Sequence, residues 1–298
     1  MSRGWRKVMH KQSDQADGIR KMRKINPVRV IAIASGKGGV GKTNLSVNIG
    51  IALAEKGQRV ALLDADMGLA NVDILLGVYP NFNLSHVLSG DKTLAEIMLD
   101  GPSGLKVIPG ASGIQKMSEL STIEQAAVIH AFSEMDQDLD VLIVDTAAGI
   151  SGNVVNFARA CQEIIVIVCD EPTSLTDAYA FIKLLNRDYG LSNFHVITNM
   201  VKTVQQGRAL FQKLTNVTDH YLDVTLRFLG AIPYDDYLRK SVQQQTPVVV
   251  AFPQSKSSIA MKEIAEKIDS WPLKTQTGNY IEFFIEKMIQ YNSQMDTP

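Results

Sequence analysis

The 298-residue sequence is poor in cysteine and holds only Cys161 and Cys169. Two cysteines cannot form the disulfide framework of a small secreted domain. They also lack the CxxC spacing and the nearby histidine that would indicate a metal site. Cys169 ends the apolar run 164–168, which is typical of a buried strand. We therefore expect both thiols to be inert core residues in a reducing cytoplasm.

Long apolar segments are absent too. No run approaches the roughly 18 apolar residues that a helix needs to span a bilayer. The basic N-terminal segment is not followed by an apolar stretch of about 7–15 residues, so it does not resemble a secretory signal. These absences predict a chain that is soluble or that lies on a membrane surface.

The net charge is close to zero, at −1, but it is unevenly distributed. Residues 1–29 hold nine Lys and Arg residues against Asp14 and Asp17, which gives +7 and leaves −8 for the remaining 269 residues. A basic arm on an acidic body indicates that the arm contacts something anionic or acidic. The acidic body argues against direct nucleic-acid binding, because phosphate contacts need a basic face. We interpret residues 1–27 as a flexible basic arm.

From residue 28 onward, short apolar runs alternate with segments of helical periodicity. The runs predict strands at 28–34, 60–63, 105–108, 141–144, 164–168, 194–198 and 228–232. Helices are predicted at 44–55, 123–135, 174–188 and 204–220. Continuous apolar strands are typical of a sheet that is covered on both faces. The predicted fold class is therefore α/β: a single doubly wound, mostly parallel sheet with helices on both faces, over residues 28–274.

A glycine-rich segment lies between the first strand and the first helix. It matches the P-loop pattern G-x-x-x-x-G-K-[ST] in its expected context, and its residues are Gly36, Lys37, Gly38, Gly39, Val40, Gly41, Lys42 and Thr43. Glycines let successive backbone N–H groups surround an anion, and the start of the following helix adds positive potential. We expect Lys42 to reach the β- and γ-phosphates and the Thr43 hydroxyl to bind Mg²⁺. The sequence thus predicts a nucleotide site for ATP or ADP.

Lys37 stands early in this loop, as in the deviant Walker A motif K-G-G-x-G-K-[ST]. With it the chain resembles the MinD/ParA family of P-loop ATPases. In that family the early lysine reaches across a dimer to the partner's nucleotide, which makes Lys37 a catalytic candidate beside Lys42. The resemblance implies a homodimer with ATP and a monomer with ADP or without nucleotide. The alternative is a surface lysine beside the phosphates of a monomer.

Three aspartates follow predicted strands, where a parallel sheet places its ligands. Asp64 and Asp66 match the family's D-x-D, and Asp145 ends a Walker B strand. The resemblance implies that Asp66 orients the attacking water and that Asp64 lies near Mg²⁺. It also implies that Asp145 holds Mg²⁺ through water. The segment 146–149 resembles the family's switch II.

Two further positions match the family's adenine contacts. Asn199 ends a strand where the family asparagine hydrogen-bonds the base, and an amide offers both a donor and an acceptor. Pro233 matches a segment that flanks the adenine, although a simple loop proline fits it almost equally well. Asn44 directly follows Thr43 and is a further nucleotide-binding candidate, at a position where MinD and ParA usually carry threonine.

The whole chain resembles one branch of the family, the flagellar-number regulators FlhG and FleN. The arm carries a D-Q-A-x-x-L-R-like motif, and its residues are Asp14, Gln15, Ala16, Ile19 and Arg20, with Ile19 at the leucine position. The segment 145–149 resembles the branch's D-T-x-A-G. The resemblance implies that the arm docks on an FlhF-type GTPase. It also implies a flagellar C-ring protein and a flagellar master transcriptional activator as partners.

The last predicted helix is amphipathic. Residues 275–278 are a predicted linker, and the helix over 280–291 has apolar residues at i, i+3, i+4 and i+7, namely Ile281, Phe284, Ile285 and Met288. In the family such a tail binds membrane, which implies a peripheral location at the cytoplasmic membrane in the ATP state. Lys287 is the only basic residue of this helix, so a helix folded back onto the body is the rival interpretation.

The resemblance implies a slow, Mg²⁺-dependent ATPase that regulates the number and placement of flagella. A MinD-like selector of the division site would share the nucleotide site but would lack the D-Q-A arm. A ParA-like positioner of DNA or cargo would need a basic surface. A reductase like the nitrogenase iron protein would need paired cysteines at a dimer interface, and no cysteine follows the Walker B segment closely.

Overall fold

The architecture comes from a computed structural model that describes residues 28–66, 72–110, 127–132, 139–272 and 280–293. Its strands form one eight-stranded sheet in the order β3-β4-β2-β5-β1-β6-β7-β8. The strands are β1 (Arg29–Ser35), β2 (Val60–Ala65), β3 (Leu99–Asp100), β4 (Lys106–Pro109), β5 (Val141–Ala148), β6 (Glu163–Cys169), β7 (Asn193–Val201) and β8 (Thr225–Pro233). All neighbouring pairs are parallel except β3 with β4.

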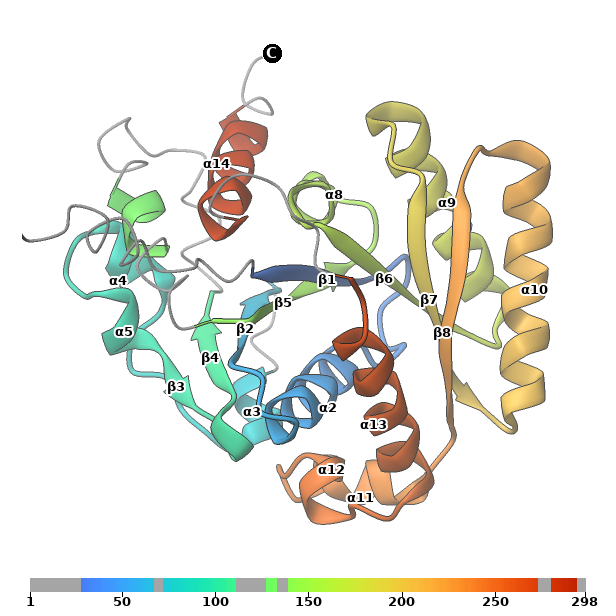
Figure 1. Cartoon of the computed structure of the whole chain (residues 1–298), viewed down its shortest axis with the longest axis horizontal. Helices are drawn as coiled ribbons and strands as arrows, with labels where there is room; N and C mark the ends of the chain where they lie inside the picture. The colour runs from blue at the N-terminus through green and yellow to red at the C-terminus, as the bar shows by residue number, and fades with distance from the viewer. Residues whose placement is uncertain (1–27, 67–71, 111–126, 133–138, 273–279, 294–298) are drawn as a thin grey trace, which may run out of the picture.

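Helices cover both faces of this sheet (Figure 1). In chain order they are α2 (Lys42–Glu55), α3 (Val72–Leu76), α4 (Leu84–Leu88), α5 (Leu94–Ile97), the 3₁₀ turn η1 (Pro102–Gly104), α8 (Gly152–Ala160), α9 (Pro172–Tyr189), α10 (Val204–Tyr221), α11 (Asp236–Gln243), α12 (Val248–Ala251), α13 (Lys256–Asp269) and α14 (Tyr280–Ser293). Helices α2 and α13 pack on one face, and α8, α9, α10 and α14 pack on the other. The doubly wound, mostly parallel fold predicted from the sequence is confirmed.

The central strands are buried on both faces, which explains their continuous apolar sequences. All seven residues of β1 and all six of β2 are buried. Strand β5 lies between β1 and β2, so the β1–α2–β2 unit is a crossover rather than a pair of neighbours. Because β1, β2 and β5 run in parallel, the residues that follow them meet at one edge of the sheet.

Several elements were not predicted. Strand β3 is two residues long and pairs antiparallel at the edge of the sheet, which is too short to give a pattern. Helices α8, α11 and α13 were also missed. The helix predicted at 123–135 falls mainly outside the described residues, although 127–132 include a helical segment.

Helix α14 lies against the body of the molecule. Its residues Ile281, Phe284, Ile285 and Met288 are each at most 1% exposed, and they share a cluster with β1, β5 and Phe157 of α8. Figure 1 shows α14 above the start of β1 and beside α8. The folded-back alternative for the tail is therefore the arrangement observed here. No helix in the described part of the chain is long and apolar enough to cross a membrane.

Candidate functional site

The glycine-rich loop connects β1 to α2 at the carboxyl edge of the sheet (Figure 1). Gly39 and Gly41 have φ values of 76° and 90°, in the left-handed region that favours glycine. A Cβ on Gly41 would also lie 2.6 Å from Nδ2 of Asn199. Both backbone conformation and space therefore require glycine at position 41. The loop leaves its backbone exposed at Gly38 and Gly39, as an anion cradle requires.

Lys42 and Thr43 begin α2, directly after this turn. Lys42 is buried, and burial lowers the pKa of its ammonium group, while Asp145 and Asp66 act in the opposite direction. A buried cation that faces carboxylates at a helix N-terminus is suited to binding a multiply charged anion. The geometry is therefore compatible with the predicted role of Lys42 at the phosphates.

Asp64 and Asp145 lie side by side on the neighbouring parallel strands β2 and β5. Burial, with Asp145 as a second cause, raises the pKa of Asp64 to about 7. Burial raises the pKa of Asp145 to about 6, although the Ser46 and Thr43 hydroxyls and Lys42 oppose the shift. Two buried carboxylates on adjacent strands carry negative charge that a divalent cation would compensate.

A magnesium ion fits this arrangement. Oδ1 of Asp145 accepts a 2.7 Å hydrogen bond from the Ser46 hydroxyl, whereas its buried Oδ2 has no hydrogen-bond partner among the described residues. Oxygen atoms of Thr43, Asp64 and Asp145 form the hard donor set that Mg²⁺ prefers. When bound, the ion would offset the negative charge of the phosphates. These three residues would hold it, as the sequence predicts.

Asp66, the predicted water-positioning residue, follows β2. Its backbone N–H donates to Oδ1 of Asp64 at 3.2 Å, which ties the two acidic positions together. The residues that come directly after it, 67–71, lie outside the described part of the chain. The role of Asp66 stays a prediction.

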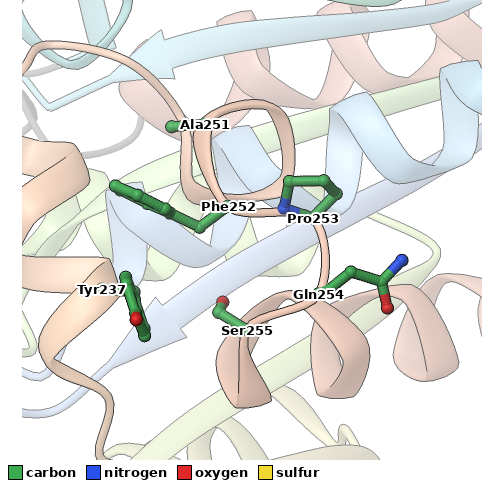
Figure 2. A pocket seen from close by; sticks show the side chains of 6 residues that line it. All are labelled: Tyr237, Ala251, Phe252, Pro253, Gln254 and Ser255. Carbon is green, nitrogen blue, oxygen red and sulfur yellow. The ribbon is translucent and has the colours of Figure 1, made fainter.

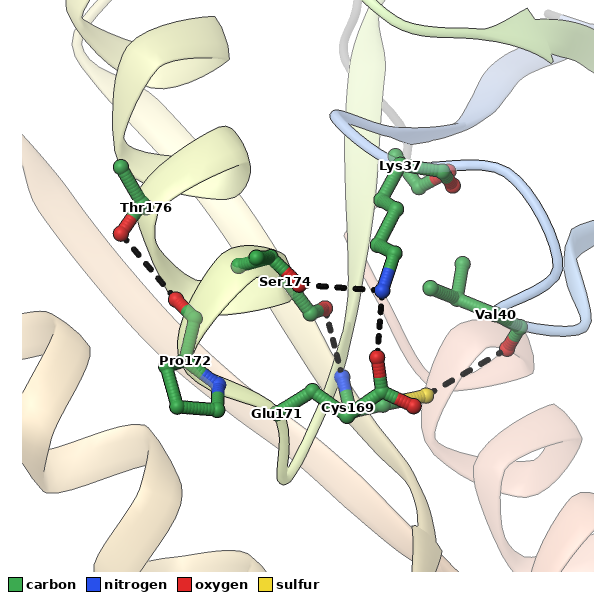
Figure 3. Close-up of polar contacts among 9 residues, drawn as sticks. Lys37, Val40, Cys169, Glu171, Pro172, Ser174 and Thr176 are labelled. Carbon is green, nitrogen blue, oxygen red and sulfur yellow. Dashed lines mark hydrogen bonds and ion pairs between the residues drawn. The ribbon is translucent and has the colours of Figure 1, made fainter.

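Lys37 points away from the other loop residues towards the start of α9 (Figure 3). Its ammonium group forms an ion pair with Glu171 and donates to the Thr173 hydroxyl at 3.0 Å. The hydrogen bond with Glu171 is the main reason that the pKa of Lys37 is raised. Glu171 is the N-cap residue of α9 and follows β6. The sequence indicated Lys37 but not this intramolecular acceptor.

The carbonyl oxygen of Val40 connects the loop to two strands. Nδ2 of Asn199 donates to it at 2.8 Å, and Sγ of Cys169 lies 3.8 Å away (Figure 3). Oδ1 of Asn199 is buried and has no partner in the part of the chain that the structure describes. Because the amide NH2 carries a second N–H, the side chain can still offer both an acceptor and a donor to a base edge.

A pocket of about 260 Å³ adjoins this asparagine. Asn44, Asn199 and Pro233 line it, so the structure brings the two predicted adenine-side residues together with Asn44. The rest of the wall was not predicted from the sequence and is formed by Met200, Tyr234, Asp235, Leu238, Arg239 and Val242. Met200 has φ 57°, uncommon for a residue with a side chain, and α11 supplies three of the others. No sequence pattern indicated that a helix would line this pocket.

A second pocket, of about 350 Å³, shares no lining residue with the first (Figure 2). Tyr237 of α11 and Phe252, which follows α12, form its walls, with their ring centroids 4.9 Å apart. Ser255, the N-cap of α13, lies at its base. None of the predicted site residues lines this pocket.

Two further groups of functional residues were predicted from the sequence. The docking residues of the arm, from Asp14 to Arg20, fall outside the described residues. The apolar stripe of α14 is buried on the body, as described above. The two thiols have no place in the site chemistry, since burial raises the pKa of Cys169 to about 11 and raises that of Cys161 further.

The ParA family profile, described as NUBPL iron-transfer P-loop NTPase, matches residues 26–269. The chain belongs to the ParA/MinD family of P-loop NTPases. Among solved ParA/MinD structures, MinD of Aquifex aeolicus superposes with a TM-score of 0.63 at 28% identity, covering 83% of this chain and 100% of that one. MinD of Pyrococcus horikoshii, complexed with Mg-ADP, gives 0.65 at 27% identity and covers 82% and 96%.

Two ParA/MinD relatives carry flagellar names. Antiactivator FleN of Pseudomonas aeruginosa is 54% identical over 273 residues, which is 92% of this chain and 98% of that protein. Flagellum site-determining protein YlxH of Helicobacter pylori is 33% identical over 88% of this chain and 90% of its own length. The predicted resemblance to the flagellar branch is thereby confirmed.

Proposed function

We propose that this protein is a Mg²⁺-dependent ATPase that dimerises with ATP and regulates the number and placement of flagella. ATP would occupy the loop of residues 36–43, with adenine in the pocket beside Asn199. Asp66 would position the water that attacks the γ-phosphorus, and Lys42 would stabilise the charge that develops on the phosphates. Hydrolysis to ADP would return the monomer. Turnover would be slow unless a partner stimulates it.

The observation that supports a dimer is the position of Lys37. In the single chain its ammonium group is held by Glu171 and Thr173, away from Lys42 and Thr43. A catalytic lysine that bonds outward at a surface is available to a second subunit. Lys37 could leave Glu171 for a γ-phosphate at a small cost in free energy, because exposed ion pairs contribute little to stability.

Similarity to FleN and YlxH over nearly the whole chain supports the flagellar role. The proposed partners are an FlhF-type GTPase that meets the arm, a flagellar C-ring protein, and a flagellar master transcriptional activator held inactive. In the ATP state, α14 would leave the body and bind the inner face of the cytoplasmic membrane. A dimer presents two such helices, so two weak membrane contacts act together in the ATP state. The attachment is lost when hydrolysis returns the monomer. Direct nucleic-acid binding is not part of the proposal.

A MinD-like division-site selector is the second candidate. MinD of Bacillus subtilis is 28% identical over 82% of this chain, so the nucleotide site alone does not separate the two functions. The D-Q-A motif of the arm favours the flagellar candidate.

The oligomeric state tests the proposal. Asp66→Ala should trap an ATP-bound dimer, because it removes the group that positions water and leaves the phosphate contacts intact. Size-exclusion chromatography with light scattering should give a stable dimer with ATP and Mg²⁺, and a monomer with ADP. Lys37→Ala in the same background is the matched control and should restore the monomer. A monomer under all conditions for Asp66→Ala would refute the dimerising switch.

A further inference from the structure

The second pocket, between α11 and α13, has aromatic walls and is accessible from solvent. The rings of Tyr237 and Phe252 lie 4.9 Å apart, and Figure 2 shows Pro253 and Ser255 around the same space. Its volume of about 350 Å³ is at the lower end of the range of roughly 300–1,000 Å³ for small-ligand sites. Tyr237 is 49% exposed, so this wall would not enclose a ligand. A small, open pocket of this kind suits one large side chain of a partner protein better than a free small molecule.

Two lysines belong to the elements that line this pocket. Nζ of Lys240 lies 5.2 Å from the centroid of the Tyr237 ring, and Lys256 directly follows Ser255 at the start of α13. Both lysines are exposed, and neither forms an ion pair within the described part of the chain. Residues 235–256 hold three Lys and Arg against two Asp, a net charge of +1, whereas residues 30–298 as a whole carry −8. This local excess of positive charge favours an acidic partner segment.

Helix α11 contributes to both pockets. Tyr237 lines the aromatic one, and Leu238, Arg239 and Val242 line the pocket beside the predicted adenine-binding asparagine. Of the eight residues of α11, Ser241 alone is buried. A helix with so few buried contacts of its own has low local stability, so its position depends on what packs against it.

The start of α11 is attached to the start of α13. The carboxylate of Asp235 accepts from the backbone N–H of Tyr237 at 3.0 Å, and from the N–H and the hydroxyl of Ser257 at 2.9 Å each. Helix α13 in turn packs on α2, the helix that begins with the phosphate-binding residues, and Lys262 pairs there with Glu55 at 2.9 Å. A group that packs on Tyr237 would therefore hold α11 against a firmly packed part of the molecule.

We infer that the pocket lined by Tyr237, Phe252 and Ser255 docks one aromatic side chain from an acidic segment of a partner protein, and that α11 couples this docking to nucleotide binding. The side chain would pack against the two rings, with neighbouring carboxylates paired to Lys240 and Lys256. Docking would order α11, so a nucleotide that contacts α11 would bind more tightly. By reciprocity, the nucleotide would strengthen docking by the same factor. The coupling rests on the proposed function, which puts adenine beside α11, whereas the docking does not.

Peptide titrations of the full chain test the docking. The probe is a capped peptide with one tryptophan between two pairs of glutamates. One comparison peptide replaces the tryptophan with alanine, and another replaces the four glutamates with lysines. N-acetyltryptophan amide represents a free small molecule. Amide NMR spectra of the chain with ADP and Mg²⁺ report the dissociation constant and the residues that each compound contacts.

Tyr237→Ala removes one wall of the pocket and should weaken binding of the tryptophan–glutamate peptide about tenfold. The matched control is Tyr221→Ala, at a tyrosine of α10 that is 60% exposed and lies outside the pocket, and it should have no effect. Thermal unfolding checks that each variant is folded. Equal affinity of Tyr237→Ala and the unmodified chain, or no peptide binding at millimolar concentrations, would overturn the docking site.

Lys240→Gln/Lys256→Gln should weaken binding of the same peptide by about two- to tenfold, since exposed ion pairs are individually weak. Lys202→Gln/Lys213→Gln removes two other exposed lysines and is the matched control. Equal affinities of the glutamate and lysine peptides would overturn the acidic class of partner. Equal binding of N-acetyltryptophan amide would also overturn it and assign the pocket to a small aromatic molecule.

Calorimetry of ADP binding tests the coupling. Saturating tryptophan–glutamate peptide should raise the affinity for ADP at least about fivefold in the unmodified chain and should have no effect in Tyr237→Ala. An unchanged affinity for ADP with the peptide bound would overturn the coupling through α11. Light scattering with ATP measures dimerisation separately, so a failed switch and a failed docking site are distinguishable.

Discussion

At the scale of single residues, the contact between Lys37 and Glu171 connects the nucleotide loop to helix α9. The ammonium group of Lys37 bonds to Glu171 and Thr173, at the N-terminus of α9, rather than to the phosphate-binding residues of its own loop. A Cβ on Gly36 would lie 2.2 Å from the carbonyl oxygen of Asp177, so the loop and α9 also touch through their backbones. Movement of Lys37 towards a second subunit would therefore remove its contacts with Glu171 and Thr173 at the start of α9.

Glu171→Gln should favour the dimer. The substitution removes the charge that competes with the partner's phosphates for Lys37 while it keeps a similar shape. Because exposed ion pairs are weak, we expect a two- to fivefold decrease in the dimer dissociation constant with ATP. Sedimentation velocity measures it.

Thr173→Ala is the control for Glu171→Gln, since it removes only the neutral hydrogen bond and should have a smaller effect. An unchanged or weaker dimer for Glu171→Gln would show that this ion pair does not restrain Lys37.

At the scale of elements, α14 is attached to the body by apolar packing and by one stacked cation, Arg159. Arg159 of α8 lies between two aromatic rings, with its Cζ atom 3.8 Å from the centroid of Tyr189 and 3.7 Å from that of Tyr291. Tyr189 ends α9 and Tyr291 lies in the last turn of α14. Helix α8 begins at Gly152, shortly after β5 ends at Ala148. One short helix therefore joins the segment that follows Asp145 to the docked tail.

Arg159→Ala should loosen α14. Cation–π contacts contribute about 0.5–2 kcal/mol each, so loss of the contact with Tyr291 should raise the undocked population by about 2- to 30-fold. Hydrogen exchange of the α14 amides measures this directly, because local opening sets their exchange rates.

A double-mutant cycle assigns the effect of Arg159→Ala. Tyr291→Leu alone should act like Arg159→Ala, and the double variant should add little. Tyr189→Leu keeps the α14 contact and serves as the control. If Arg159→Ala left α14 exchange at the rate of the unmodified protein, apolar packing alone would hold the helix.

At the scale of the whole molecule, the buried carboxylates link stability to pH and to magnesium. The pKa values of Asp64 and Asp145 are about 7 and about 6 in the folded chain, above their ordinary value of 3.8. Between pH 4 and 7 the folded chain therefore binds more protons than the unfolded chain at these groups. Their contribution to the free energy of unfolding falls as the pH rises through this window and is constant above it.

We expect the nucleotide-free protein to have a higher Tm at pH 6 than at pH 8 from these two groups. Asp64→Asn should raise the Tm at pH 8 and make the Tm less dependent on pH. The corresponding increase in the free energy of unfolding at pH 8 should be on the order of a few kcal/mol. Mg²⁺ with ADP favours the ionised carboxylates, so its stabilising effect should be larger at pH 8. Calorimetry at both pH values, with ADP plus a chelator as the control, measures these differences. Parallel Tm profiles for Asp64→Asn and the unmodified chain would contradict the link.

The sequence by itself determined the sheet and the phosphate loop of this protein. The strands that form the centre of the sheet are buried on both faces and therefore carry continuous apolar runs. The glycine-rich loop needs particular residue types at fixed spacing, so a local pattern is enough to find it. The aspartates of β2 and β5 could be predicted to lie at one edge of the sheet, because parallel strands bring their carboxyl ends together.

Only the tertiary structure decided the contacts between segments that are far apart in the chain. Glu171 lies 134 residues from Lys37, and Asn199 lies 159 residues from Val40, whose carbonyl oxygen orients its amide. The base-side wall from α11 and the stacking of Arg159 against Tyr291 are equally non-local. The apolar stripe of α14 suits a membrane and a protein core alike, since both exclude water. Its docked position therefore depends on the shape of the surface it meets, which no local pattern contains.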